Sequence, residues 1–270
     1  MDYKKKLIGL AQEHFNQRLL PELEKIVSDK DIQAVITGSV SFGYCDKYSD
    51  VDGKIILPEK YIKDARKIKG LTITKEGHKI EFQPTTIDEF CINPLLKSSS
   101  VEAWKGCSPF GLYAISKFII MYDPQESMAR LQKKVNGYYP KELQKTQILN
   151  YWRAFLEDGV YNASRDMKRK NSFMFNLHMN NAMWNAMMLG FLFNKKYHPT
   201  HHQWLYHEFS GLRELVPKVR PVMEKMLKTA DMAKKYGLLS KLIREFQNYA
   251  RKKKLIAPEY LTDWAKIPWR

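Results

Sequence analysis

The sequence contains little cysteine and no uninterrupted apolar run of membrane-spanning length. Its three cysteines are widely spaced and form no Cys-x-x-Cys pair, so they indicate neither a disulfide framework nor a zinc site: Cys45, Cys91 and Cys107. The most apolar segment, residues 173–193, is interrupted by four asparagines and a histidine, whereas a membrane span needs about 20 predominantly apolar residues. Because the first residues also lack the pattern of a secretory leader, we expect a cytoplasmic protein without a membrane partner, and a buried helix over residues 173–193.

Acidic side chains are fewer than basic ones. The chain carries 45 lysines and arginines against 29 aspartates and glutamates, for a formal net charge of +16. The excess is concentrated in residues 151–270, which hold 22 basic and 10 acidic side chains. A basic region of this kind favours an anionic partner, such as a nucleotide, a nucleic acid or an acidic membrane surface. Solvated, lysine-rich helix faces would give the same composition.

Hydrophobic periodicity divides the chain into two parts. The first part alternates helix and strand patterns, with helices expected over 3–28 and 59–69 and strands over 32–36, 51–57, 71–74 and 79–82. Pro21 is expected to kink or split the first helix. After about residue 124 the strand patterns end and helical patterns run to the C-terminus. The sequence therefore predicts an α+β protein, with an α/β domain of mixed sheet over residues 1–124 and an all-helical domain over residues 125–270.

Two carboxylates lie one residue apart where the second strand begins. Asp50 and Asp52 project from the same side of a strand, with Cα atoms about 6.6 Å apart. Like charges at this distance raise each other's pKa unless a cation lies between them, and Mg²⁺ prefers such oxygen ligands. A third carboxylate from a neighbouring strand would complete the site, with Glu81 as first choice and Glu76 as second. The alternative is an exposed strand and loop that carry incidental acids.

The residues before the two aspartates suit phosphate binding. Gly38-Ser39 follows a buried strand, and a tight turn there would leave backbone N–H groups and the Ser39 hydroxyl available to phosphate oxygens. Together these residues resemble the nucleotidyltransferase superfamily of the DNA polymerase β type, whose signature is a hydrophobic strand, Gly-Gly or Gly-Ser, a short spacer and an acid-apolar-acid triplet. The resemblance is carried by Gly38-Ser39, Phe42-Gly43, Ser49-Asp50-Val51-Asp52 and Glu81.

The resemblance continues more weakly along the chain. Residues 115–122 are an apolar run, and residues 116–124 are similar to the last sheet strand of small bacterial members. Residues 193–205 resemble the helical C-terminal region of antibiotic-type nucleotidyltransferases. Gln203 departs from that pattern, because relatives often have a lysine before the tryptophan.

The resemblance implies a reaction and a set of roles. Asp50 and Asp52 would ligate two Mg²⁺ ions, and Glu81 would complete the second metal site and accept the proton of an attacking hydroxyl. A nucleoside monophosphate would pass from an NTP, with ATP the favoured donor, to an acceptor with release of pyrophosphate. The nucleotide-binding candidates within the signature are Gly38, Ser39 and Ser49.

The densest basic stretch of the helical half is residues 161–170. It places Arg165 and Arg169 four residues apart, on one helix face. A guanidinium there can contact a triphosphate bidentately. Arg165 is the nucleotide-binding candidate because apolar and small residues surround it. For Lys168, Arg169 and Lys170 a solvated helix face explains the charge equally well.

The acceptor is left open by the sequence. The basic helical half favours an RNA end or a protein hydroxyl over a cationic aminoglycoside, and a neutral small molecule such as an antibiotic remains compatible with it. Two other functions stay open: a non-catalytic nucleic-acid-binding protein on a nucleotidyltransferase scaffold, and the nucleotidyltransferase component of a toxin–antitoxin pair. A homodimer is also left open.

Overall fold

The computed structural model describes residues 2–90, 95, 98, 100–199 and 202–267. The chain forms two compact units, Met1–Tyr138 and Tyr139–Arg270. The first unit holds a five-stranded mixed sheet and the second is built of helices, which confirms the predicted α+β class. Cys45 is half-buried and Cys107 is buried, and Cys91 lies outside the described residues.

The sheet of the first unit contains one parallel strand pair among antiparallel ones. Its order is β3-β4-β2-β1-β5, and only β2 and β4 run parallel. A parallel pair requires a crossover, which the chain provides through α4 (Glu59–Ala65) and β3. The strands are β1 (Gln33–Thr37), β2 (Val51–Ile56), β3 (Thr72–Lys75), β4 (His78–Thr85) and β5 (Ile119–Tyr122).

The first helical segment is divided as Pro21 predicted. A π-helical turn, Phe15–Leu19, separates α1 (Tyr3–His14) from α2 (Leu20–Leu23), and Pro21, which has no N–H to donate, stands in the first turn of α2. The remaining helices of this unit are α3 (Gly38–Phe42), α6 (Val101–Lys105), α7 (Pro109–Lys117) and α8 (Ser127–Asn136).

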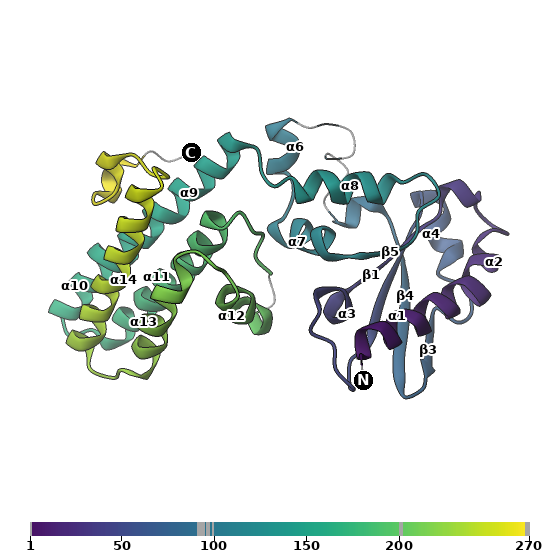
Figure 1. Cartoon of the computed structure of the whole chain (residues 1–270), viewed down its shortest axis with the longest axis horizontal. Coiled ribbons are helices and arrows are strands. Elements are labelled where there is room, and N and C mark those ends of the chain that lie inside the picture. Colours follow the sequence, from purple (N-terminus) through teal and green to yellow (C-terminus); the bar gives the residue numbers. More distant parts are fainter. Residues whose placement is uncertain (1, 91–94, 96–97, 99, 200–201, 268–270) are drawn as a thin grey trace. The chain divides into compact units, whose positions relative to one another are not determined.

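The core of the first unit lies between α1 and one face of the sheet, and Figure 1 shows α1 crossing the strands. Leu7 and Phe15 from the N-terminal segment join Val51, Ile55 and Phe82 from the strands in one buried cluster. The Phe15 and Phe82 rings lie 5.6 Å apart. Since side chains alternate along a strand, the residues between these core positions face away from α1.

The apolar run at 115–122 forms two elements. Its first three residues end α7, which Ser108 caps through a hydrogen bond from the Gly111 N–H, and only Ile119–Tyr122 forms β5. The first unit also extends to Tyr138 and includes α8. The division predicted at residue 124 assigned catalysis to residues 1–124 and contacts with the acceptor to residues 125–270. Those two roles stay predictions.

The second unit packs its helices around aromatic side chains. Trp152, Phe155 and Phe246 are fully buried, and the Phe155 ring contacts both of the others edge-on. A π-helical segment, Glu157–Asn162, interrupts the first long helix. The helices are α9 (Lys141–Leu156), α10 (Ala163–Lys168), α11 (Ser172–Phe193), α12 (His202–Ser210), α13 (Val216–Lys228) and α14 (Met232–Lys252).

The apolar segment 173–193 is α11, and its two halves differ. The C-terminal half is buried, as the sequence predicted, whereas Phe173 is 77% exposed and Leu177 is 43% exposed. The expectation of a wholly buried helix was therefore wrong for the first two turns. None of the helices in the described part of the chain combines the length and the apolar character needed to cross a membrane.

Candidate active site

The pairing of β2 with its neighbours brings two of the predicted acids together. Asp52 lies opposite Glu81 in the parallel β2–β4 pair and opposite Thr37 in the antiparallel β1–β2 pair. Val51 and Gly53 point into the core, so Asp52 faces the other side of the sheet. Glu81 alternates in the same way with the buried Ile80 and Phe82. Asp50, directly before β2, is exposed.

Gly38 lies against the Asp52 carboxylate. Its φ of +65° lies in the left-handed region that favours glycine. A Cβ atom added at Gly38 would come 2.1 Å from Asp52 Oδ2, so a side chain there would displace the carboxylate. The Ser41 hydroxyl donates to the Gly38 carbonyl at 3.0 Å and closes the turn. Ser39 is half-buried in this turn, beside Gly38.

The loop before Asp50 is held by its own polar groups. The Ser49 hydroxyl donates to Asp46 Oδ1 at 3.1 Å and accepts from the Asp46 N–H at 2.9 Å. The buried His78, at the start of β4, contacts the Ser49 carbonyl through Nδ1 at 3.1 Å. In this structure Ser49 therefore positions Asp50, and its role in nucleotide binding stays a prediction.

The electrostatics of the site are dominated by acids. The pKa of Asp52 is raised, first by the atoms packed around its carboxyl group and then by the charge of Asp50, with a smaller contribution from Glu81. Asp52 is exposed as a residue, but the Gly38 turn shields its carboxyl oxygen from solvent on one side. Lys54 and Lys79 lower the pKa of Asp52. The pKa stays raised because burial of the carboxyl group and the charge of Asp50 together outweigh these two lysines.

Lys79 is a site residue that sequence reasoning missed. Its ammonium group forms an ion pair with the Glu81 carboxylate, and both side chains are about half exposed. A pair this open to solvent is weak, so it can exchange for another cation. The alternation Lys79-Ile80-Glu81 was the available signal, because it puts both charges on one face of β4.

The donor set fits a hard divalent cation. Asp50, Asp52 and Glu81 offer oxygen ligands only, the type that Mg²⁺ prefers. Asp50 and Glu81 both add to the rise in the pKa of Asp52, and a cation among these acids would favour its ionised form. Within the described residues, no three acid, histidine or cysteine side chains stand grouped as a ready metal site. Glu81 is held by Lys79 and would have to leave it. The second choice, Glu76, lies in the β3–β4 turn and pairs with Lys6 at 2.8 Å.

The variant Asp52→Asn is expected to make folding more favourable at neutral pH. Because the folded state raises the pKa of Asp52, the stability that this group contributes is fully present below its unfolded pKa and is lost as the pH rises through the folded value. Asparagine stays neutral, so the variant should be more stable than wild type at pH 7, by on the order of 0.5 kcal/mol for so exposed a group. The advantage should shrink as the pH falls and vanish below the unfolded pKa of aspartate, about 3.9. Thermal melts across this range test it, with Glu24→Gln as an exposed control; a pH-independent difference would contradict it.

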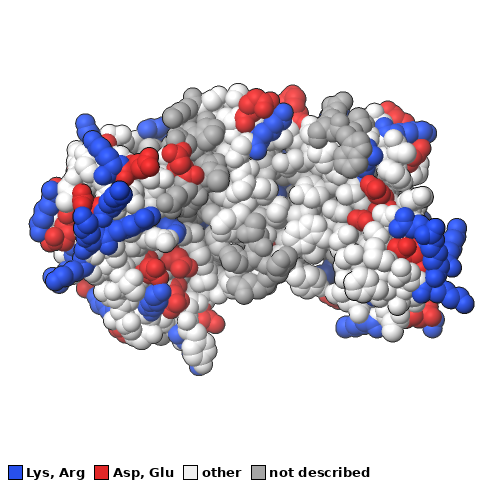
Figure 2. Space-filling view, turned by 180° about the vertical axis from the view of Figure 1, so that it is seen from behind, with Lys and Arg blue, Asp and Glu red and all other residues white. Residues whose placement is uncertain are grey.

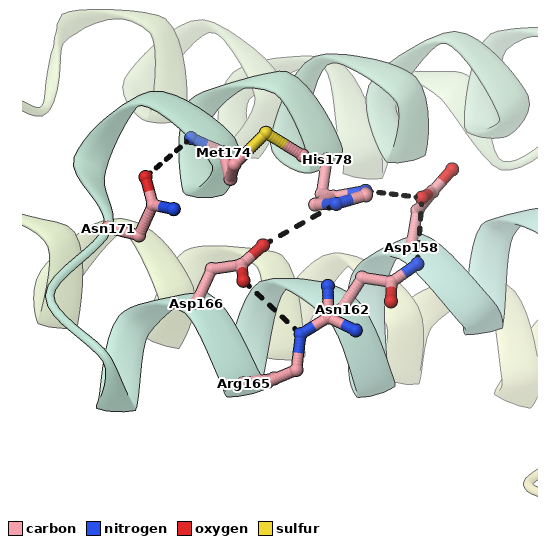
Figure 3. A network of polar contacts seen from close by, with 7 residues as sticks. All are labelled: Asp158, Asn162, Arg165, Asp166, Asn171, Met174 and His178. Atoms are coloured by element: carbon pink, nitrogen blue, oxygen red, sulfur yellow. Dashed lines mark hydrogen bonds and ion pairs between the residues drawn. The ribbon is translucent and has the colours of Figure 1, made fainter.

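Arg165 lies in the second unit, within the network of Figure 3. Its Nε contacts Asp166 Oδ1 at 3.3 Å, and its guanidinium lies over the Tyr161 ring at 5.7 Å. The other oxygen of Asp166 lies 3.4 Å from His178 Nε2, while His178 Nδ1 contacts Asp158 at 2.7 Å. These contacts fix the direction of Arg165. Its predicted contact with a triphosphate stays a prediction.

Replacing His178 by leucine is expected to destabilise the second unit by about 1–3 kcal/mol. The imidazole contacts Asp158 Oδ1 at 2.7 Å, and leucine cannot replace that hydrogen bond. The buried Asp166 Oδ2, 3.4 Å from the imidazole, has no hydrogen-bond partner among the described residues even in wild type, so the expected cost comes from Asp158. Urea denaturation measures the loss. The matched variant His178→Gln retains an amide donor and should recover part of the stability. Equal stability of wild type and His178→Leu would contradict this account of the network.

Comparison with known proteins supports the fold. Residues 104–205 match the family model described as a domain of unknown function, DUF4037; the matched segment contains Arg165 and begins after the three carboxylates. Among solved structures, the chain is similar to a nucleotidyltransferase-like protein from Exiguobacterium sibiricum, with 13% sequence identity, a TM-score of 0.50, and coverage of 93% of this chain and 78% of that one. No curated protein matches. The chain therefore has a nucleotidyltransferase-like fold.

Proposed function

We propose that this protein is a Mg²⁺-dependent nucleotidyltransferase that moves a nucleoside monophosphate from an NTP, with ATP the favoured donor, to a hydroxyl acceptor. The observation that carries the proposal is the register between β2 and β4, which sets Asp52 opposite Glu81 on the face of the sheet turned away from α1. The Gly38 turn lies directly against Asp52. The antibiotic-nucleotidyltransferase-like branch, suggested by residues 193–205, is part of this proposal.

Each residue has a role in the proposed reaction. Asp50 and Asp52 would hold the metal, which when bound neutralises phosphate charge and stabilises the attacking and leaving oxygens. Glu81 would leave Lys79, complete the ligand set and take the proton of the acceptor hydroxyl. Gly38 and Ser39 would donate hydrogen bonds to the phosphate tail. Such transfers depend mainly on positioning and charge neutralisation, which rigid strands supply.

The surface of the second unit supports an RNA end as the anionic acceptor. Lys168, Arg169 and Lys170 are exposed at the end of α10, and Tyr161 and Phe173 on either side of them are 54% and 77% exposed. Exposed aromatic rings beside cations can stack bases and contact phosphates. In Figure 2 lysines and arginines lie on the second unit, at the right of the view, and also on the first unit, at the left. The alternative is a small-molecule acceptor, which the experiment below also includes.

The test is release of pyrophosphate by the purified full chain. Each of the four NTPs is offered with Mg²⁺ and with an RNA bearing a free 3′-hydroxyl, a hydroxyl-bearing antibiotic or no acceptor. We expect pyrophosphate release that depends on both RNA and Mg²⁺. The RNA should at the same time acquire the label of a labelled NTP. Salt-sensitive RNA binding without transfer would instead support the non-catalytic nucleic-acid-binding protein.

A further inference from the structure

A second site candidate lies within the helical unit alone. A cavity of about 670 Å³, open to solvent on one side, is lined by the end of α11, the segment after α12 and the end of α14. This volume is typical of small-molecule sites. Four cations line it, Lys195, Lys196, Arg213 and Lys253, together with apolar side chains that include Leu212 and Leu255.

The frame of the cavity is fixed by reciprocal hydrogen bonds. The Asn194 side-chain amide donates to the carbonyls of Gly190 at 2.8 Å and Glu214 at 3.1 Å, and its oxygen accepts from the Glu214 N–H at 3.0 Å. The end of α11 is thereby joined to the segment that carries Arg213. The Phe193 and Tyr249 rings, stacked 5.6 Å apart, join α11 to α14.

The one acid among the lining residues is already compensated. Glu214 accepts a hydrogen bond from the Tyr249 hydroxyl and pairs with Lys253 at 2.9 Å. The Tyr249 hydrogen bond, and then Lys253, lower the pKa of Glu214. Glu214 therefore stays ionised, and its charge is paired with that of Lys253 in the wall of the cavity.

Two cations in the cavity keep their charge available. In the described part of the chain neither Lys195 nor Arg213 forms an ion pair, and both are exposed. Lys195 has a φ of +51° directly after the C-cap of α11, a position where glycine is usual. A lysine at this position also interacts favourably with the negative end of the helix dipole. That interaction stabilises the folded protein and requires no ligand.

We propose that this cavity binds a small phosphorylated molecule that carries an apolar or planar part. Phosphate oxygens would pair with Lys195 and Arg213, and the rest of the molecule would lie against Leu212 and Leu255. Charge-assisted contacts of this kind are the stronger hydrogen bonds. The site lies wholly in the second unit and does not depend on the proposed transfer reaction.

The test is calorimetric titration of the full chain without divalent cations. The probes are pyrophosphate and ADP, with citrate as a non-phosphate anion. Lys195→Gln/Arg213→Gln should weaken ADP binding about tenfold or more. The control Lys234→Gln/Lys241→Gln removes two exposed charges of α14 and should change little.

The inference would be overturned by no binding of either phosphate probe to wild type, by equal weakening in the cavity variant and the α14 control, or by citrate binding as tight as pyrophosphate. The single variant Arg213→Gln, in the segment between α12 and α13, gives a second measurement if the double variant folds poorly. Lower stability of the Lys195 variant with unchanged ADP affinity would assign Lys195 to the helix dipole and overturn the inference as well.

Discussion

Asp52→Asn is expected to reduce pyrophosphate release by about 10²–10³-fold, the scale of losing one electrostatic contact to the reacting phosphate. The side chain stays nearly the same size, so the contact with the Gly38 turn is kept while the negative charge is lost. Asp52 is the acid that lies opposite Glu81 and nearest Gly38. Steady-state release of pyrophosphate over a range of Mg²⁺ concentrations measures the loss.

Two further variants make this experiment specific. Glu24→Gln removes an exposed acid of the same unit, outside the sheet, and should keep full activity. Lys79→Met frees Glu81 from its ion pair and should lower the Mg²⁺ concentration needed for half-maximal activity. If Asp52→Asn were folded and as active as Glu24→Gln, the proposed metal site would be wrong.

Gly53→Ala is expected to destabilise the first unit by about 1–3 kcal/mol through overpacking. Gly53 lies opposite Phe82 in the β2–β4 pair, and an added Cβ atom would come 2.3 Å from the Phe82 ring. That ring is 1% exposed and packs on Phe15, so it has little room to move. The shift in the urea midpoint of unfolding, followed by circular dichroism, measures the cost.

A double-mutant cycle isolates this contact. Phe82→Leu leaves a cavity and should be destabilising alone, but in combination with Gly53→Ala it makes room for the new methyl group. The double variant should therefore be more stable than the sum of the single effects by about 0.5–3 kcal/mol. The control Gly9→Ala, on the exposed side of α1 with no neighbour in reach, should stabilise by about 0.5–1 kcal/mol. Strictly additive effects at Gly53 and Phe82 would show that the two residues do not compete for space.

Local sequence patterns determined the elements and the outward direction of the acids. The apolar-acid-small alternation of Val51, Asp52 and Gly53 fixes which face of β2 is buried, because side chains along a strand alternate regardless of the neighbouring strand. Helical periodicity after residue 125 likewise needs no long-range information. The split at Pro21 follows from a missing N–H. These features depend on residues a few positions apart, and the structure shows them where the sequence predicted them.

Only the tertiary structure decided which residues meet. The register that sets Asp52 opposite Glu81 joins strands about 30 residues apart through a crossover, and no local pattern specifies a register across a crossover. The Lys79–Glu81 ion pair, the approach of Gly38 to Asp52 and the fixing of Ser49 by His78 depend on that register or on loop geometry. The cavity beside Lys195 and Arg213 depends on three helix ends meeting. Side-chain alternation is local and could be predicted, whereas strand register and helix packing are set by the whole buried core.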